Sequence, residues 1–251
     1  INKSITLTAS GTNRPTIYTS GDAHALNITV DNVTVSNLLV RYNGTTANRY
    51  GIFVNGSAAT KRQNITIFRN NVTTLAFNTN YGIRVRYGFL VNLTENNVST
   101  SGSDASNEGL YLDLNTNLTV SANIVLTNGT SSSIGIDVIN TNTSTFTNNT
   151  IRTRGTVTGT NLGIFTVTWS SNNTISGNVI NTSGGVANYG LQLQDSYNNN
   201  ASSNTINTSG TTDAGGIVLN GVSANNSISA NMITAKGTST NNYGIYLIGP
   251  N

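Results

Sequence analysis

The stretch "NNTISGNVINTSGGVANYGLQL" (172–193) decides the fold, because its aliphatic residues alternate with polar ones over short runs. Each run is bounded by Gly, Asn or Ser, which are typical of turns. A period of two with Ile, Val, Leu and Thr dominant predicts short strands and not helix. Ile175, Ile180 and Leu191 then fall on three successive strands of one repeat.

The same pattern recurs along the chain at intervals of 26 to 31 residues. One column is a glycine followed by an aliphatic residue: Gly51, Gly82, Gly109, Gly135, Gly163, Gly190, Gly216 and Gly244. A second column is apolar: Ile67, Leu93, Val120, Phe146, Ile175, Ala201 and Ile228. Three residues after each of these stands an asparagine: Asn70, Asn96, Asn123, Asn149, Asn178, Asn204 and Asn231. Two residues later comes a β-branched residue: Val72, Val98, Val125, Ile151, Ile180, Ile206 and Ile233.

Three short strands cannot bury a face alone, so identical positions must stack on the next repeat, about 4.8 Å away. The sequence therefore predicts an all-β, right-handed parallel β-helix (β-solenoid) with three strands per rung and about eight to nine rungs of ~26–28 residues. We expect one domain over 1–251, with an irregular N-terminal rung at 1–24 and regular repeats at 25–251. Ala201 is the expected weak point of its column, since larger side chains fill the other positions.

The asparagine column has an expected structural role. A tight corner between strands favours a left-handed backbone, which Asn tolerates better than most residues. Stacked amides can also hydrogen-bond along the column. We expect both properties at Asn70 and its six equivalents.

Composition excludes several functions. Only 8% of the residues are charged and the net charge is +3, without a basic stripe, so nucleic acid is not an expected partner. Cysteine is absent and there is a single histidine, so neither a transition-metal site nor a cofactor is expected. No apolar run approaches the roughly 20 residues of a membrane span.

The pattern "NNTISGNVI…NYGLQL" resembles the parallel β-helix repeats of the pectin-lyase-like superfamily, which includes surface and carbohydrate-associated repeat proteins. The resemblance extends from about residue 25 to 251 and implies the fold. Members of the superfamily include pectate lyases, polygalacturonases, phage tailspikes and adhesins, so the resemblance does not select one function.

A catalytic site has one candidate location. Glycoside cleavage requires an acid and a carboxylate, and the outward side of the Gly-led strands predicts one group of neighbours: Arg84, Arg86, Asp113 and Asp137. They are the weaker, catalytic alternative, for a lyase or a hydrolase. The structural alternative is an ion-pair ladder worth a few tenths of a kcal/mol per pair.

The same outward face predicts an apolar column: Phe53, Ile139, Phe165, Val167, Val218 and Tyr246. A column of exposed apolar residues indicates a covered surface. We expect self-association through it, head-to-tail, lateral or both, with a filament as one outcome.

Eighteen Asn-x-Ser/Thr sites suggest covalent N-glycans. Asn64, Asn117, Asn172 and Asn225 recur on alternate rungs, which would space bulky groups. The remaining candidates are Asn43, Asn55, Asn128, Asn181 and Asn207.

Two functional hypotheses follow from the sequence. The first is a non-enzymatic extracellular or cell-surface protein, N-glycosylated, that assembles end to end into a filament or a surface layer. The end of the chain, just after a first strand, lacks what its start supplies, which favours that assembly. The second is a polysaccharide lyase, hydrolase or carbohydrate-binding module that uses the Arg84, Asp113 and Asp137 face.

Overall fold

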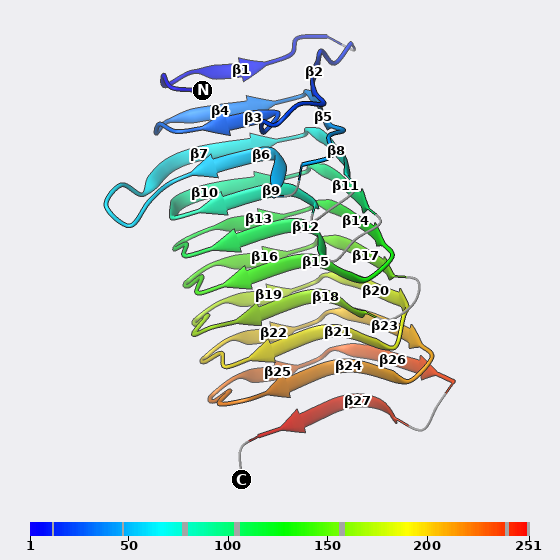
Figure 1. Ribbon diagram of the computed structural model, residues 1–251. Helices are drawn as coiled ribbons and strands as arrows, with labels where there is room; N and C mark the ends of the chain where they lie inside the picture. The colour runs from blue at the N-terminus through cyan, green and yellow to red at the C-terminus, as the bar shows by residue number, and fades with distance from the viewer. Residues whose placement is uncertain are drawn as a thin grey trace.

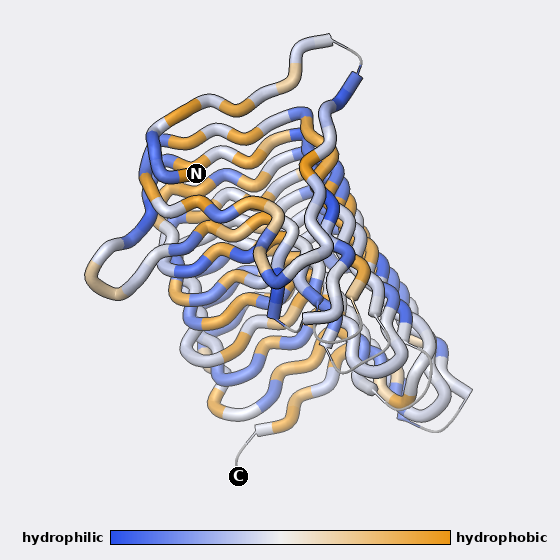
Figure 2. The backbone as a smooth tube through the Cα atoms, turned by 45° about the horizontal axis from the view of Figure 1, so that its top comes forward, coloured by the Kyte–Doolittle hydropathy of each residue, from blue (hydrophilic) through white to orange (hydrophobic). Residues whose placement is uncertain are grey.

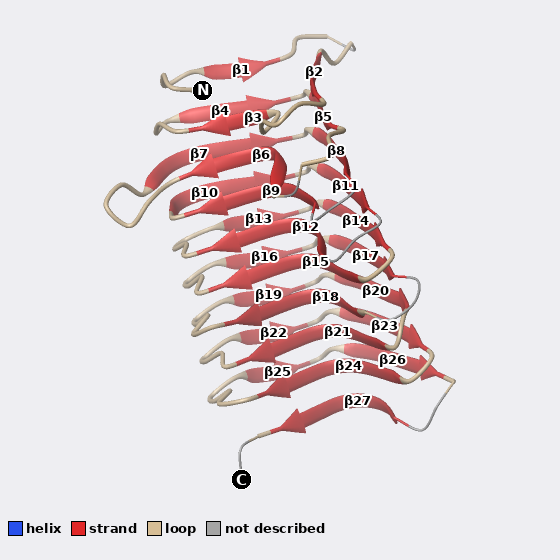
Figure 3. Ribbon diagram, in the orientation of Figure 1, coloured by secondary structure: helices blue, strands red, loops and turns tan. Residues whose placement is uncertain are grey.

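The chain coils into a stack of rungs made of strands and turns (Figures 1 and 3). The structure is a computed structural model that describes residues 1–11, 13–46, 48–76, 80–102, 106–155, 159–238 and 241–249. Over these residues, 27 strands form three parallel sheets of nine strands each. The parallel β-solenoid, predicted with about eight to nine rungs, is therefore confirmed, and it has about nine.

Each rung contributes one strand to each sheet, and the sheets are called A, B and C in the order in which the chain visits them. Sheet A contains β1 (Thr6–Thr8), β4 (Val33–Ser36), β7 (Arg62–Phe68), β10 (Gly88–Thr94), β13 (Thr119–Ser121), β16 (Thr145–Thr147), β19 (Thr174–Ser176), β22 (Asn200–Ser202) and β25 (Ser227–Ser229). Sheet B contains β2 (Thr16–Thr19), β5 (Leu39–Tyr42), β8 (Asn71–Ala76), β11 (Asn97–Gly102), β14 (Ile124–Gly129), β17 (Thr150–Gly155), β20 (Val179–Gly184), β23 (Thr205–Gly210) and β26 (Met232–Gly237). Sheet C, which faces the viewer in Figure 1, contains β3 (Leu26–Ile28), β6 (Arg49–Asn55), β9 (Asn80–Arg86), β12 (Ser106–Asp113), β15 (Ser132–Ile139), β18 (Thr160–Val167), β21 (Ala187–Gln194), β24 (Asp213–Asn220) and β27 (Asn241–Ile248).

The apolar columns align residue by residue. Ile175 pairs with Phe146 on one side and with Ala201 on the other, and Ile180 pairs with Ile151 and Ile206. Figure 2 shows hydrophobic and hydrophilic positions alternating along the strands and repeating from rung to rung. Burial of each inward Ile, Val or Leu contributes about 1.5–3 kcal/mol, so one aliphatic core runs through the stack. Ala201 is fully buried in it.

The glycine column is explained by close packing between sheets C and B. A Cβ at Gly163 would lie 2.2 Å from Ile180 Cγ2 and 2.4 Å from the carbonyl oxygen of Gly190. Gly82, Gly109 and the other inner members meet the β-branched residue of sheet B in the same way. The glycine column and the β-branched column of the sequence thus pack against each other.

The asparagine column forms a buried ladder at the corner between sheets A and B. Asn96 Nδ2 donates to the carbonyl oxygen of Ile67 at 2.8 Å and to Asn123 Oδ1 at 3.1 Å. Asn123 Oδ1 also accepts the backbone N–H of Asn96 at 2.9 Å. The predicted hydrogen bonding along the column is confirmed.

The conformational part of that prediction is wrong. The left-handed residue at each of these corners precedes the asparagine, as at Glu95 (φ 54°) before Asn96 and Ala122 (φ 55°) before Asn123. The physical reason is direction: the amide must point inward to join the ladder, whereas the residue before it is exposed and carries the turn.

Two further polar ladders line the other corners, and the sequence analysis missed both. At the corner from B to C, Asn161 Nδ2 donates to Asn188 Oδ1 at 2.9 Å. At the corner from C to A, Asn173 and Asn199 receive backbone N–H groups and donate to the preceding rung. An Asn-x-Gly spacing at Asn80, Asn161 and Asn188 was the available signal for the first of them.

The first rungs differ from the rest in two ways. Residues 1–24 supply β1 and β2, which pair with β4 and β5. Residues 56–61 form a loop that protrudes between β6 and β7 (Figure 1) and accounts for the longest repeat interval.

Candidate functional site

Charged and aromatic side chains gather on the outward face of sheet C, across β6, β9, β12 and β15. The glycine of each strand interrupts the alternation, so the residue before it and the second residue after it both face outward. Ring contacts show this: Tyr81, before Gly82, lies 5.0 Å from Tyr111, the second residue after Gly109. We call the group the acid–tyrosine cluster, and its members are Tyr50, Tyr81, Arg84, Glu108, Tyr111, Asp113 and Asp137.

The four residues that the sequence singled out lie on three adjacent strands. Arg84 Nε and Nη2 donate to the two carboxylate oxygens of Asp113 at 3.0 and 2.9 Å. Arg86 Nε lies 3.6 Å from Asp113 Oδ2. Asp137 belongs to the next strand, where it pairs with Tyr111.

The Arg84–Asp113 pair is more than a surface ion-pair ladder. The side chain of Asp113 is 8% exposed and that of Arg84 is 16% exposed, and a bidentate arginine–carboxylate pair is among the strongest hydrogen-bonded pairs. The guanidinium also lies 4.7 Å from the ring centroid of Tyr111 and 5.2 Å from that of Tyr50. The position of the Asp113 side chain is therefore fixed by Arg84.

Glu108 is the residue that sequence reasoning missed. It precedes Gly109, the position that Tyr50, Tyr81 and Tyr189 occupy in other rungs, and this shared column was the signal that could have found it. The residue is only 6% exposed. Its Oε2 atom has no hydrogen-bond partner among the described residues.

Glu108 and Asp137 form a buried pair of carboxyl groups that resist ionisation. Burial, followed by the charge of Asp113, raises the pKa of Asp137 to about 7. Burial, followed by the charge of Asp137, raises the pKa of Glu108 well above its usual value. Asp137 Oδ1, like Glu108 Oε2, has no hydrogen-bond partner in the described part of the chain. Two carboxyl groups at one buried place repel each other when both are ionised, so the state in which one of them is protonated is favoured.

Tyr81 and Tyr111 lie next to Glu108 and Asp137 on the neighbouring strands, and further aromatic residues continue toward the N-terminal rungs. The rings of Tyr50 and Tyr81 lie 5.1 Å apart, and the hydroxyl of Tyr50 accepts a hydrogen bond from Arg84. His24 stacks on Tyr50 at 4.6 Å. Burial, then the charge of Arg49, lowers the pKa of His24 to about 4, so at neutral pH it is uncharged and its Nδ1 accepts the backbone N–H of Tyr50 at 3.3 Å.

The structure corrects the apolar column that was expected to form a contact surface. Phe53 is 6% exposed and Val218 is 1% exposed, because side chains of the same chain cover them. Arg84 and His24 lie on Phe53, so this residue and Val218 are not part of an exposed stripe. Ile139, Phe165 and Val167 are partly exposed, and Tyr246 is 36% exposed.

The candidate glycosylation sites differ in exposure and in backbone conformation. Asn43, Asn64, Asn128, Asn172, Asn207 and Asn225 are exposed, whereas Asn55, Asn117 and Asn181 are partly buried. The alternate-rung set has a left-handed backbone, with φ of 54° at Asn64, 57° at Asn117, 56° at Asn172 and 56° at Asn225. These four asparagines therefore have a conformational role at the corners, where Asn is favoured over other non-glycine residues.

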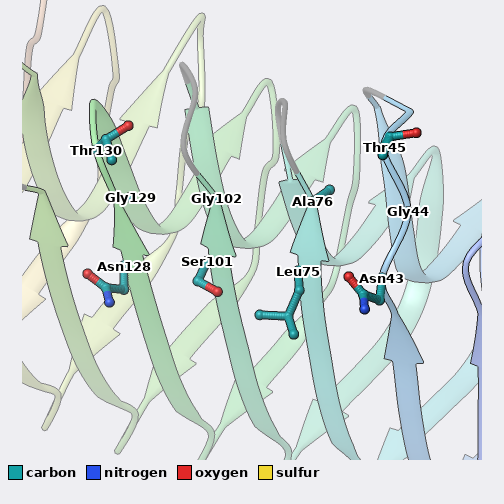
Figure 4. Close-up of a pocket in the computed structure, with 10 residues that line it drawn as sticks. All are labelled: Asn43, Gly44, Thr45, Leu75, Ala76, Ser101, Gly102, Asn128, Gly129 and Thr130. Atoms are coloured by element: carbon teal, nitrogen blue, oxygen red, sulfur yellow. The ribbon is translucent and has the colours of Figure 1, made fainter.

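A shallow groove lies at the end of sheet B, away from the acid–tyrosine cluster. Asn43, Leu75, Ser101 and Asn128 stand in one row across neighbouring strands (Figure 4), and the groove has a volume of about 560 Å³. It contains two of the candidate glycosylation sites and no charged side chain.

Within the described ranges, no group of three or more His, Cys, Asp or Glu side chains could hold a metal ion. The same ranges contain no helix long and apolar enough to cross a membrane.

A family model described as the right handed beta helix region matches residues 15–189 and 81–250. No curated protein matches the sequence. Similar solved structures include the mannuronan C-5 epimerase AlgE6 A-module of Azotobacter vinelandii, at 11% identity and a TM-score of 0.46, covering 100% of this chain and 92% of the other.

Two further solved structures have a comparable likeness. The surface protein and adhesin PfbA of Streptococcus pneumoniae is 11% identical, with a TM-score of 0.45 and coverage of 98% of this chain and 67% of that one. The Dettilon tailspike protein is 10% identical, with a TM-score of 0.41 and coverage of 93% and 62%. At these identities the likeness concerns the fold alone.

Proposed function

The chain belongs to the right-handed β-helix family, and we propose that it cleaves a polysaccharide at the outward face of sheet C. The observation that carries the proposal is the buried pair Glu108 and Asp137, each with an unpartnered carboxyl oxygen and a raised pKa. Perturbed carboxyl groups gathered at one place are typical of catalytic sites. In a chain with 8% charged residues, three acids on one face also form a marked concentration.

Cleavage of a glycosidic bond needs one protonated carboxyl group and one carboxylate. The pair supplies both, because Glu108, whose pKa is raised well above its usual value, keeps its proton at neutral pH, whereas Asp137, with a pKa of about 7, is partly ionised there. Glu108, with the strongly raised pKa, donates its proton to the leaving glycosidic oxygen. Asp137 accepts a proton from the attacking water. Asp113 acts through charge, since its ion pair with Arg84 keeps a fixed negative group beside Asp137.

Hydrolysis of a panel of neutral and acidic polysaccharides, followed by the release of reducing ends, tests the proposal. We expect Glu108→Gln and Asp137→Asn each to lower the rate by about 10²–10⁴-fold. Glu95→Gln is the matched control, because Glu95 pairs with Arg69 on the surface, away from sheet C. Undiminished activity in the double variant, or no activity of the wild type on any polysaccharide of the panel, would contradict the proposal.

A second candidate function is that of a glycosylated, self-associating protein outside the cell or on its surface. Exposure of six of the candidate asparagines supports it. Intact mass of native material tests the glycans, and a mass equal to that of the 26.3 kDa chain would exclude them. Electron microscopy tests the assembly: filaments support it, and short single rods at every concentration contradict it.

A further inference from the structure

The exposed ring of Trp169 stacks on the partly exposed ring of Tyr197 at the edge where sheet C passes to sheet A. This edge consists of the turns after β18 and β21, and we call it the C–A edge. The ring centroids lie 5.4 Å apart and the planes differ by 12°. Trp169 is 63% exposed, which is unusual for the only tryptophan of a chain whose other large side chains mostly fill a core.

An additional residue in the turn after β18 places Trp169 at the surface. Two residues, Thr168 and Trp169, separate the end of β18 from the buried Ser170. In the rungs before and after, a single residue, Asn140 or Asp195, stands between the strand and the equivalent buried residue. Thr168 and Trp169 have φ of 54° and 64°, and Trp169 N–H is held by the carbonyl oxygen of Asp195 at 2.8 Å. Single left-handed residues are common at the corners of this stack, but among the described residues Thr168 and Trp169 are the one place where two consecutive non-glycine residues have this conformation.

Uncharged hydrogen-bonding groups lie in the turn of Trp169 and in the turn of the rung before it. Ser171 Oγ donates to Asn142 Oδ1 at 2.9 Å, and Asn172 Nδ2 donates to Ser171 Oγ at 3.3 Å. The one charged side chain in these turns is Asp195, whose Oδ1 accepts the backbone N–H of Val222 at 2.8 Å. The sequence has no lysine or arginine between Arg154 and Lys236. The site therefore offers aromatic rings whose polar neighbours are uncharged, apart from Asp195.

We propose that the Trp169–Tyr197 platform binds a neutral oligosaccharide. A pyranose ring has an apolar C–H face, which can pack against the exposed part of the Trp169 indole, and a rim of hydroxyl groups, which fits amides and hydroxyls. The lack of basic side chains disfavours uronates and phosphates. The site goes beyond the proposed cleavage reaction, because it uses neither Glu108 nor Asp137.

The single tryptophan makes the test direct. Fluorescence excited at the indole band reports only Trp169, and we would titrate the protein with cellohexaose, maltohexaose and mannohexaose in turn. At least one of them should give a saturable change in emission with a Kd of about 1 mM or below. Tyr197→Ala should weaken that binding at least tenfold. Tyr18→Ala removes an exposed tyrosine of β2 and should leave it unchanged. Trp169→Ala, followed by calorimetry, should abolish the heat of binding.

Several results would overturn the proposal. The first is the lack of a saturable signal with all three hexasaccharides, and the second is equal binding by the Tyr197→Ala variant. Binding of only a charged hexagalacturonate would exclude a neutral ligand. Emission that depends on protein concentration and not on sugar would identify a contact between two copies instead. The Glu108→Gln/Asp137→Asn variant should bind as the wild type does, so failure of cleavage and failure of this site are distinguishable.

Discussion

Gly163 is required because its position leaves no room for a Cβ atom. The space that a Cβ would occupy there is taken by Ile180 Cγ2 and by the backbone oxygen of Gly190. Its φ is not in the left-handed region, so the requirement is one of volume and not of conformation. Each inner glycine of the column is therefore paired sterically with one β-branched residue of sheet B.

Gly163→Ala should destabilise the protein by about 1–3 kcal/mol, because the backbone oxygen of Gly190 cannot move aside as a flexible side chain can. The free energy of unfolding in urea measures the effect. Gly244→Ala is the control, since nothing lies within 4 Å of a Cβ at that position, and it should change the free energy of unfolding by at most about 0.5 kcal/mol. Equal effects of the two variants would contradict the steric explanation.

The raised pKa of Asp137 predicts that the free energy of unfolding depends on pH. Its pKa is raised from 3.8 to about 7, so between these values the folded chain binds more protons than the unfolded chain. The stability contributed by protonated Asp137 is complete below about pH 4 and is lost as the pH rises through about 7. Unfolding free energies of the wild type should therefore fall over this window more steeply than those of Asp137→Asn.

Urea unfolding at a series of pH values between 4 and 8 measures the difference. The variant should be the more stable protein above pH 7, by roughly a few kcal/mol. Glu95→Gln, at an exposed ion pair, should retain the slope of the wild type. Parallel curves for the wild type and Asp137→Asn would show that Asp137 ionises as readily in the folded chain as in the unfolded one.

At the scale of the element, the asparagine ladder at the corner between sheets A and B holds each strand in register with the next rung. Asn123 uses its whole amide: Nδ2 donates to Leu93 and Asn149, and Oδ1 accepts from Asn96. The two donors and two lone pairs of the side chain are thus occupied. No other uncharged side chain of this length offers the same four groups, which explains why the column admits only asparagine over seven rungs.

Asn123→Ala should leave the backbone N–H of Asn96 and the carbonyl oxygen of Leu93 buried without partners. Each such group costs about 1–3 kcal/mol, so the variant should lose several kcal/mol of stability or fail to fold. Asn97→Ala, at an exposed position of β11, is the control and should be nearly neutral. Thermal unfolding of both variants measures the contrast, and a mild effect of Asn123→Ala would show that the ladder is dispensable.

Element type and phase could be read from the sequence because the columns at Ile175, Asn178 and Ile180 repeat at constant offsets. The left-handed corners were assigned to the wrong residue, because both the ladder and the turn favour asparagine and the sequence does not distinguish the two reasons. Glu108 was missed for a geometric reason. Strict alternation places the residue before the glycine inside, whereas the bend at the glycine turns it outward beside Tyr81 and Asp137.

At the scale of the whole molecule, every rung contacts mainly the rungs above and below it, so stability is close to a sum over neighbours. The strand β27 is exposed along most of its length, whereas the inward residues of β12 and β15 are fully buried. Amide hydrogen exchange of this chain should be slowest in the central rungs and fastest in β27. Mass spectrometry of peptides after exchange measures it, and uniform protection along the stack would contradict the neighbour model.

The hydrogen bonds between strands and the three polar ladders all run along the axis of the stack, whereas the covalent backbone runs across it. A force applied between the two ends would therefore first break non-covalent bonds, one rung boundary after another, while the peptide chain still joins the separated rungs. A force applied across a rung would be carried by peptide bonds. The protein is in this sense a mechanically anisotropic material, soft under axial tension and stiff in the plane of each rung.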